Sequence, residues 1–121
     1  MDWRDTYIKI LDDLKIKNIR LVAYWDDIEK VQDVYDYSNI RWQVEEAQKR
    51  NVNIIFSFGR KVPRYPECFE PEWWKNTQDE NIRDLELLEY IKKTALEFKN
   101  YPAIKTWQVE NEPYWPFGEC K

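Results

Sequence analysis

The triplet Asn111-Glu112-Pro113 combines residue types that can perform acid–base chemistry on a bound ligand. Glu112 follows an apolar segment of strand length, and Pro113 fixes the backbone just beyond it, so the carboxyl group can be held rigidly at the end of a strand. The Asn111 amide offers a donor and an acceptor, as a sugar hydroxyl requires. A plain turn with a solvated acid is the alternative, but the aromatic residues on either side favour a functional site.

A second acid, Glu110, lies two residues before Glu112. In an extended chain the two would point the same way, roughly 6.5 Å apart. Glu110 could then favour the protonated form of Glu112, which a general acid needs. In the alternative that we favour, Glu110 pairs with a neighbouring base. Arg20 is the candidate partner, because a charge inside a buried strand needs one.

Aromatic residues gather in the loops that follow the expected strands. They are Tyr24 and Trp25 in the first loop, Tyr65, Trp73 and Trp74 in the second, and Tyr114, Trp115 and Phe117 in the third. Sugar rings stack their C–H faces on aromatic rings, so this distribution suits a saccharide groove, with Trp25, Tyr114 and Trp115 as candidate substrate-binding residues. Local packing is the alternative for about half of them, above all for Trp73-Trp74, which can begin a short helix.

The composition narrows the chemistry. The 121 residues are enough for one domain at most, and they contain no histidine and two cysteines, which excludes Ser-His-Asp triads and His-ligated metal sites. No metal or cofactor is expected. The net charge of −4, with acids and bases mixed, gives no basic face for nucleic acid. No apolar run reaches the roughly 18–20 residues of a membrane span, and no charged-then-apolar leader follows Met1.

Two smaller sets of residues leave alternatives open. Cys68 and Cys120 fall in loops after neighbouring strands, so either one disulfide, which would imply an oxidising compartment, or two free thiols fits. Arg60, Lys61 and Arg64 follow the Gly59 bend and could bind an acidic group, although such residues more often form a solvated face.

Hydrophobic periodicity predicts three helices that alternate with three strands. The helices are expected at 6–17, from 38 or 39 to about 50, and at 81–99, and the strands at 19–25, 52–58 and 104–109. Asn51 fits a left-handed position after the second helix. Alternation of this kind predicts an α/β fold with a parallel sheet and right-handed crossovers. The loops after the strands are long and aromatic, and such loops carry the sites of α/β proteins.

The segment Ile104–Pro113, which reads IKTWQVENEP, resembles the fourth strand of clan A glycoside hydrolases, the family 5 cellulase-like (β/α)8 barrels. The resemblance implies that Glu112 is the general acid/base and that Asn111 binds the hydroxyl next to the anomeric carbon. The stretch around Arg20 resembles the second strand, whose Arg contacts the nucleophile. The 60–68 loop resembles one in uncharacterised bacterial cellulase-like proteins and implies no role. A histidine usual after the third strand of family 5 is absent.

The resemblance implies a partial TIM barrel in which residues 1–121 are one partial catalytic domain, from the first helix to the fourth strand. Such barrels need about 250 residues. The chain then supplies Glu112 but not the nucleophile, so the isolated polypeptide is expected to be inactive on the O-glycosidic bonds of a β-linked oligo- or polysaccharide. Self-association through exposed sheet edges is expected. The alternatives are a non-catalytic carbohydrate-binding protein and a structural α/β fragment.

Overall fold

The computed structural model describes residues 2–64, 67–112 and 114. Its elements follow one another as α1 (Trp3–Asp13), β1 (Asn18–Val22), α2 (Trp25–Ile28), α3 (Ser38–Lys49), β2 (Asn53–Phe58), α4 (Glu72–Lys75), α5 (Glu80–Phe98) and β3 (Ile104–Val109). The predicted alternation of helices and strands is confirmed, and α2 and α4 are additional short helices in the loops after β1 and β2. None of the helices in the described part combines the length and apolar character that crossing a membrane requires.

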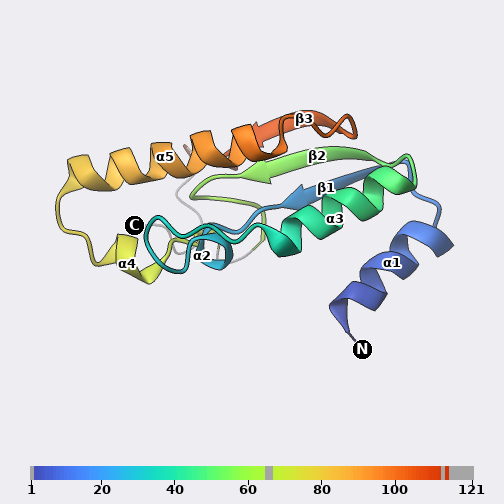
Figure 1. The fold of residues 1–121 in the computed structure, drawn as a ribbon, viewed down its shortest axis with the longest axis horizontal. Helices are drawn as coiled ribbons and strands as arrows, with labels where there is room; N and C mark the ends of the chain where they lie inside the picture. Colours follow the sequence, from blue (N-terminus) through green and yellow to red (C-terminus); the bar gives the residue numbers. More distant parts are fainter. Residues whose placement is uncertain (1, 65–66, 113, 115–121) are drawn as a thin grey trace.

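The three strands form one parallel sheet in the order β1-β2-β3. Ile55 of β2 lies between Arg20 of β1 and Thr106 of β3. Because the strands are parallel, they all end at the same edge, and the arrowheads in Figure 1 point to the side on which α2 and α4 lie. The α/β class is therefore as predicted, and the loops after the strands meet at this carboxyl edge.

The core lies between the sheet and the longer helices. The central strand buries Ile54, Phe56 and Phe58, and the Phe56 ring packs 5.0 Å from the ring of Phe98 on α5. The buried side chains of α3 are Ile40, Val44 and Ala47, which recur at the spacing of one helical face. Parallel strands that are covered by helices need this near-continuous apolar character, which is why β2 could be recognised in the sequence.

Within the described residues, the outer strands β1 and β3 each pair with β2 alone, so each has one free edge. On β3, Trp107 is 37% and Val109 50% exposed, and Ile55 in the central strand is also 37% exposed. One face of the sheet is therefore only partly covered in the described part of the chain. Self-association through these edges stays a prediction, which sedimentation velocity at rising protein concentration would test.

The observed boundaries differ most from the predicted ones at the first strand and at the first helix, which ends at Asp13 rather than at residue 17. The first strand ends at Val22 rather than Trp25, because Trp25 begins α2 and its ring lies in the core. The first helix begins at Trp3, earlier than predicted, because the Asp2 side chain accepts a hydrogen bond from the helix N-terminus and caps it. Asn51 has a φ of 57°, so the predicted left-handed residue after α3 is confirmed.

Candidate active site at the carboxyl edge of the sheet

The turn that carries Asn111 and Glu112 continues directly from β3 and is hydrogen-bonded to the chain beyond β2. The N–H of Glu110 donates to the Phe58 carbonyl (2.8 Å), and the N–H of Asn111 donates to the Lys61 carbonyl (2.8 Å). Glu110 and Glu112 have φ values of 68° and 47°, in the left-handed region that non-glycine residues seldom adopt. The turn is therefore sharp, and hydrogen bonds to the neighbouring loop hold it in place.

The Glu110 side chain holds the same two segments together. Its Oε1 accepts the N–H of Arg60 and its Oε2 accepts the N–H of Lys61, both at 2.7 Å. The predicted pairing of Glu110 with Arg20 is wrong, because backbone donors already occupy both carboxylate oxygens. Arg20 instead donates from Nη1 to Oε1 of Gln108 (3.4 Å). We call this contact between Glu110 and the two N–H groups the Glu110 clamp.

Gly59 makes room for the Glu110 clamp. Its φ of +128° lies in a region that residues with a Cβ rarely adopt. A Cβ at this position would also lie 2.5 Å from Oε1 of Glu110 and 2.9 Å from its Cδ. The sequence indicated only that Gly59 closes a strand. The structure adds a second reason for glycine at this position, which is that the Glu110 carboxylate approaches the Gly59 backbone closely.

Gln108 orients the Asn111 amide, a role that the sequence analysis missed. Its Nε2 donates to Oδ1 of Asn111 (3.0 Å) and to the Glu110 carbonyl (3.3 Å), while its Oε1 accepts from Arg20. Arg20, Gln108 and Asn111 therefore form a chain of contacts from β1 to the turn after β3. The sequence carried no clear signal for this role, because Lys105 and Thr106 are also polar residues of β3.

Lys61 also supports the turn. It is 6% exposed, and its Nζ donates to the Glu112 carbonyl (3.0 Å) and lies 3.4 Å from Oε2 of Glu67. Arg60 forms an ion pair with Glu70. The expected solvated face is therefore wrong for Lys61, which fixes the backbone of Glu112 from the side of the second loop. Of the three predicted basic residues, Arg64 alone is exposed.

The other predicted site residues have different positions. The Glu112 residue is exposed, and Asn111 is half-buried. Tyr114 is 98% exposed, so its ring is accessible to a ligand. Pro113 and Trp115 lie outside the described residues.

Trp25, in contrast, is a core residue, which corrects the prediction that it binds substrate. Its ring is 0% exposed and stacks on Tyr90 (5.1 Å between centroids), and Trp74 packs against it edge-on (5.2 Å). Its indole N–H donates to Oε1 of Glu29 (2.8 Å). No face of the ring is left for a sugar. Trp73 and Trp74 lie in α4, so the short helix predicted there is confirmed.

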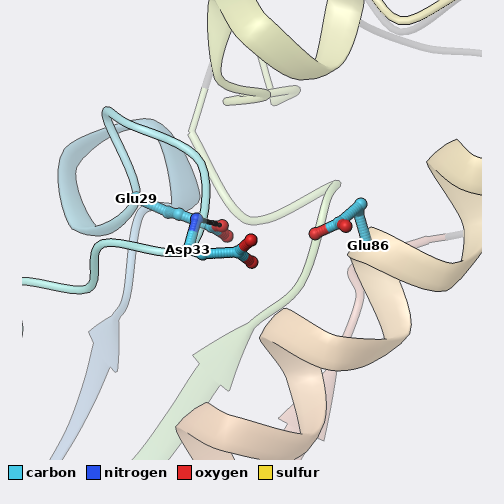
Figure 2. Close-up of side chains that lie close together, drawn as sticks. All are labelled: Glu29, Asp33 and Glu86. Atoms are coloured by element: carbon cyan, nitrogen blue, oxygen red, sulfur yellow. Dashed lines mark hydrogen bonds between the residues drawn. The ribbon is translucent and has the colours of Figure 1, made fainter.

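Glu29, Asp33 and Glu86 form an acidic cluster between the loop after β1 and helix α5. Figure 2 shows Glu29 and Asp33 beside one another and Glu86 facing them from α5, with one carboxylate oxygen of each within 4.8 Å of the others. This spacing could hold a cation. However, both oxygens of Glu29 already accept hydrogen bonds, from the indole of Trp25 and from the N–H of Asp33 (2.8 Å each). The arrangement is therefore explained by its part in joining α2 to the loop that follows.

The acidic cluster predicts a pH-dependent stability. Burial raises the pKa of Glu29 above its ordinary value of 4.5. The folded protein then keeps a proton that the unfolded chain has already lost, so the contribution of Glu29 to stability is greatest below pH 4.5 and falls as the pH rises through the raised pKa. We expect the free energy of unfolding of the wild type, minus that of Glu29→Gln, to decrease between pH 4 and 7 in urea titrations. An increase over this range would contradict the assignment.

Cys68 is disulfide-bonded. It lies in the second loop and forms an antiparallel bridge with Lys61, beside the turn at Glu112. Cys120 lies outside the described residues. Of the two alternatives, a free Cys68 thiol is therefore excluded.

The described elements form part of a (β/α)8 barrel, the class of α/β protein in which parallel strands alternate with helices and loops after the strands form the site. Solved structures with a similar fold are glycoside hydrolases. An exo-β-1,4-mannosidase from Opitutaceae bacterium strain TAV5 matches with a TM-score of 0.75 and 17% identity over 92% of this chain and 21% of its own.

Two further structures agree. A GH5_18 variant from Bifidobacterium longum, in complex with Manβ1-4GlcNAc, has a TM-score of 0.66 and 16% identity over 99% of this chain and 32% of its own. A family 39 glycoside hydrolase from Bacteroides cellulosilyticus has a TM-score of 0.61 and 18% identity over 91% of this chain and 22% of its own. The chain thus spans 21–32% of the length of these proteins. No protein-family model and no curated protein matches the sequence.

These comparisons confirm the predicted fold class and the resemblance to clan A glycoside hydrolases in the fold of the chain. At such identities the likeness concerns the fold, so the roles of individual residues rest on the geometry described above.

Proposed function

We propose that this chain carries the acid/base part of a retaining glycoside hydrolase active site. Glu112 is the general acid/base, and Asn111 binds the hydroxyl next to the anomeric carbon. The observation that supports the proposal is the turn after β3. There Asn111 and Glu112 are fixed at the carboxyl edge by hydrogen bonds from Gln108 and Lys61 and by the Glu110 clamp. Catalytic groups need such fixed positions on a rigid strand end.

In the proposed reaction Glu112 donates its proton to the departing glycosidic oxygen while a second carboxylate attacks the anomeric carbon. Glu112 then takes a proton from the water that hydrolyses the glycosyl–enzyme intermediate. Glu110 is not this second carboxylate, because both its oxygens accept backbone hydrogen bonds. The nucleophile must therefore come from another strand end, and residues 1–121 would form the second to fourth strands of one catalytic domain.

The proposed substrate is a β-linked oligo- or polysaccharide. The exo-β-1,4-mannosidase and the Manβ1-4GlcNAc complex among the structures with this fold support a β-linked sugar. The exposed ring of Tyr114 provides a surface on which a sugar can stack. Arg20 is held by Gln108 near the turn, which fits a role beside the nucleophile. Trp115 keeps its proposed role in sugar binding, whereas Trp25 does not.

The test of the proposal separates binding from turnover. The isolated chain should bind short β-linked oligosaccharides weakly and hydrolyse aryl β-glycosides negligibly, because a retaining mechanism needs a second carboxylate about 5–5.5 Å from the first. In NMR titrations of the labelled protein with β-mannobiose, Asn111→Ala should weaken binding roughly tenfold or more, since it removes hydrogen bonds to the sugar.

Glu112→Gln tests the role of Glu112 in turnover, because it removes the titratable carboxyl group but keeps the shape of the side chain. Measurable turnover that disappears in Glu112→Gln would show that the nucleophile lies within these residues. Binding that depends on Tyr114 or Trp115 and is the same in Asn111→Ala would instead favour the non-catalytic carbohydrate-binding alternative.

A further inference from the structure

A shallow depression of about 370 Å³ lies at the carboxyl edge, between the loops after β1 and β2. Its lining residues are Tyr24, Asp26, Asp27, Lys30, Arg64 and Phe69. The two loops are joined there by the hydrogen bond from the N–H of Asp26 to the Phe69 carbonyl (2.9 Å) and by the edge-on contact of Tyr24 with Phe69 (4.6 Å). None of these residues has a part in the proposed reaction.

Arg64 is held in the depression by two aromatic rings. Its guanidinium lies 4.9 Å from the Tyr24 ring centroid and 5.2 Å from that of Phe69. Its φ of 100° is unfavourable for a residue with a Cβ, and the turn that imposes it is closed by the N–H of Glu67 donating to the Arg64 carbonyl (2.7 Å). The loop therefore accepts backbone strain while it places a planar cation against a rigid aromatic support.

The other charged groups of the depression already have polar partners. Asp27 pairs with Lys30 (3.8 Å) and accepts a hydrogen bond from Asn39 (3.3 Å). Burial and the neighbouring Asp27 raise the pKa of Asp26, and the backbone N–H groups at the start of α2 offset part of this effect. Among the described residues, Arg64 has aromatic contacts but forms no ion pair or side-chain hydrogen bond. Its guanidinium donors are therefore available for a ligand.

We infer that Arg64 binds the carboxylate of a uronic acid unit in the saccharide, an inference that rests on the proposed function. A guanidinium presents paired N–H donors that match the two oxygens of a carboxylate. Asp26 and Asp27, on the facing loop, are acceptors for the hydroxyl groups of the same sugar. One acidic group together with several hydroxyls is the chemistry that this mixture of charges recognises, and it is present in a uronate.

The experiment compares two small probes by NMR titration of the full chain. Methyl β-D-glucuronide carries a carboxylate where methyl β-D-glucoside carries a hydroxymethyl group. The glucuronide should bind at least about tenfold more tightly, as a charge-assisted bidentate contact predicts. Arg64→Leu should abolish this advantage, and Arg64→Lys, which keeps the charge but not the fork, should reduce it. Arg41→Leu is the matched control, since it removes an α3 arginine whose guanidinium lies over the ring of Phe98 in α5 (5.5 Å), and it should leave the advantage intact.

Equal affinity for the two probes, or an advantage that survives in Arg64→Leu, would overturn the inference. If Arg64→Leu does not fold, undiminished preference in Arg64→Lys has the same meaning. Inorganic sulfate that reproduces the Arg64-dependent shifts at the same concentration would show a general anion site and overturn the uronate assignment. Asn111→Ala distinguishes the two proposals. If Asn111→Ala loses glucoside binding but the wild type does not prefer the glucuronide, only the inference about Arg64 is rejected. If the wild type prefers the glucuronide through Arg64 but Asn111→Ala binds both probes normally, the proposed function is rejected.

Discussion

Replacing Trp25 with alanine is expected to destabilise the folded protein by roughly 3–5 kcal/mol, the range of Trp→Ala changes in protein cores. The indole is 0% exposed, and it packs between Tyr90 of α5 and Trp74 of α4. Its removal leaves a cavity at the junction of three helices. It also deprives the buried Glu29 carboxylate of a hydrogen bond (2.8 Å), which adds to the cost.

Urea unfolding followed by far-UV circular dichroism measures this effect, because a fluorescence signal would change with the loss of a tryptophan. Trp25→Phe is the matched control. It keeps an aromatic ring against Tyr90 but loses the donor to Glu29, so it should cost about 1–3 kcal/mol. A stable Trp25→Ala protein that has lost saccharide binding would restore the role in substrate binding that the sequence predicted.

Trp25 shows why the sequence predicted the fold better than it predicted the site. The strands could be recognised because β2 is a short, mostly apolar run and both β2 and β3 are rich in β-branched and aromatic residues, and β3 was predicted with its observed limits, Ile104–Val109. These patterns are local. An aromatic residue at the end of a strand, by contrast, suits both a sugar groove and a core. Only the packing of α4 and α5 against α2 places Trp25 in the core.

The partners of Glu110 could not be read from the sequence for a related reason. Ion pairing was expected because it involves two side chains, whose charges are visible in the sequence. The actual donors are the backbone N–H groups of Arg60 and Lys61, which every residue except proline possesses. Which N–H groups are left unpaired by the sheet depends on the path of the second loop. The sequence therefore placed Glu112 at the strand end but did not reveal what holds it there.

The Gly59→Ala variant tests that support most directly, and it should destabilise the protein by about 3 kcal/mol or more. The φ of +128° at Gly59 is a strained backbone conformation for alanine, which costs about 1–3 kcal/mol. The new Cβ would also lie 2.5 Å from Oε1 of Glu110, so the carboxylate must leave the N–H of Arg60. The loss of a hydrogen bond to a charged group costs a further 1.5–3 kcal/mol or so. Displacement of the turn should also remove the saccharide binding that depends on Asn111.

A double-mutant cycle with Glu110→Ala separates these two costs. If Gly59 is needed both for its backbone conformation and to make room for the clamp, Gly59→Ala should destabilise the Glu110→Ala protein less than the wild type. The difference should approach the value of the lost hydrogen bond, and urea titrations of the four proteins would give it. Equal costs in both backgrounds would mean that backbone strain alone explains Gly59 and that Glu110 moves aside freely. Asn111 and Glu112 would then owe their position to the backbone hydrogen bonds and to Lys61, without the Glu110 side chain.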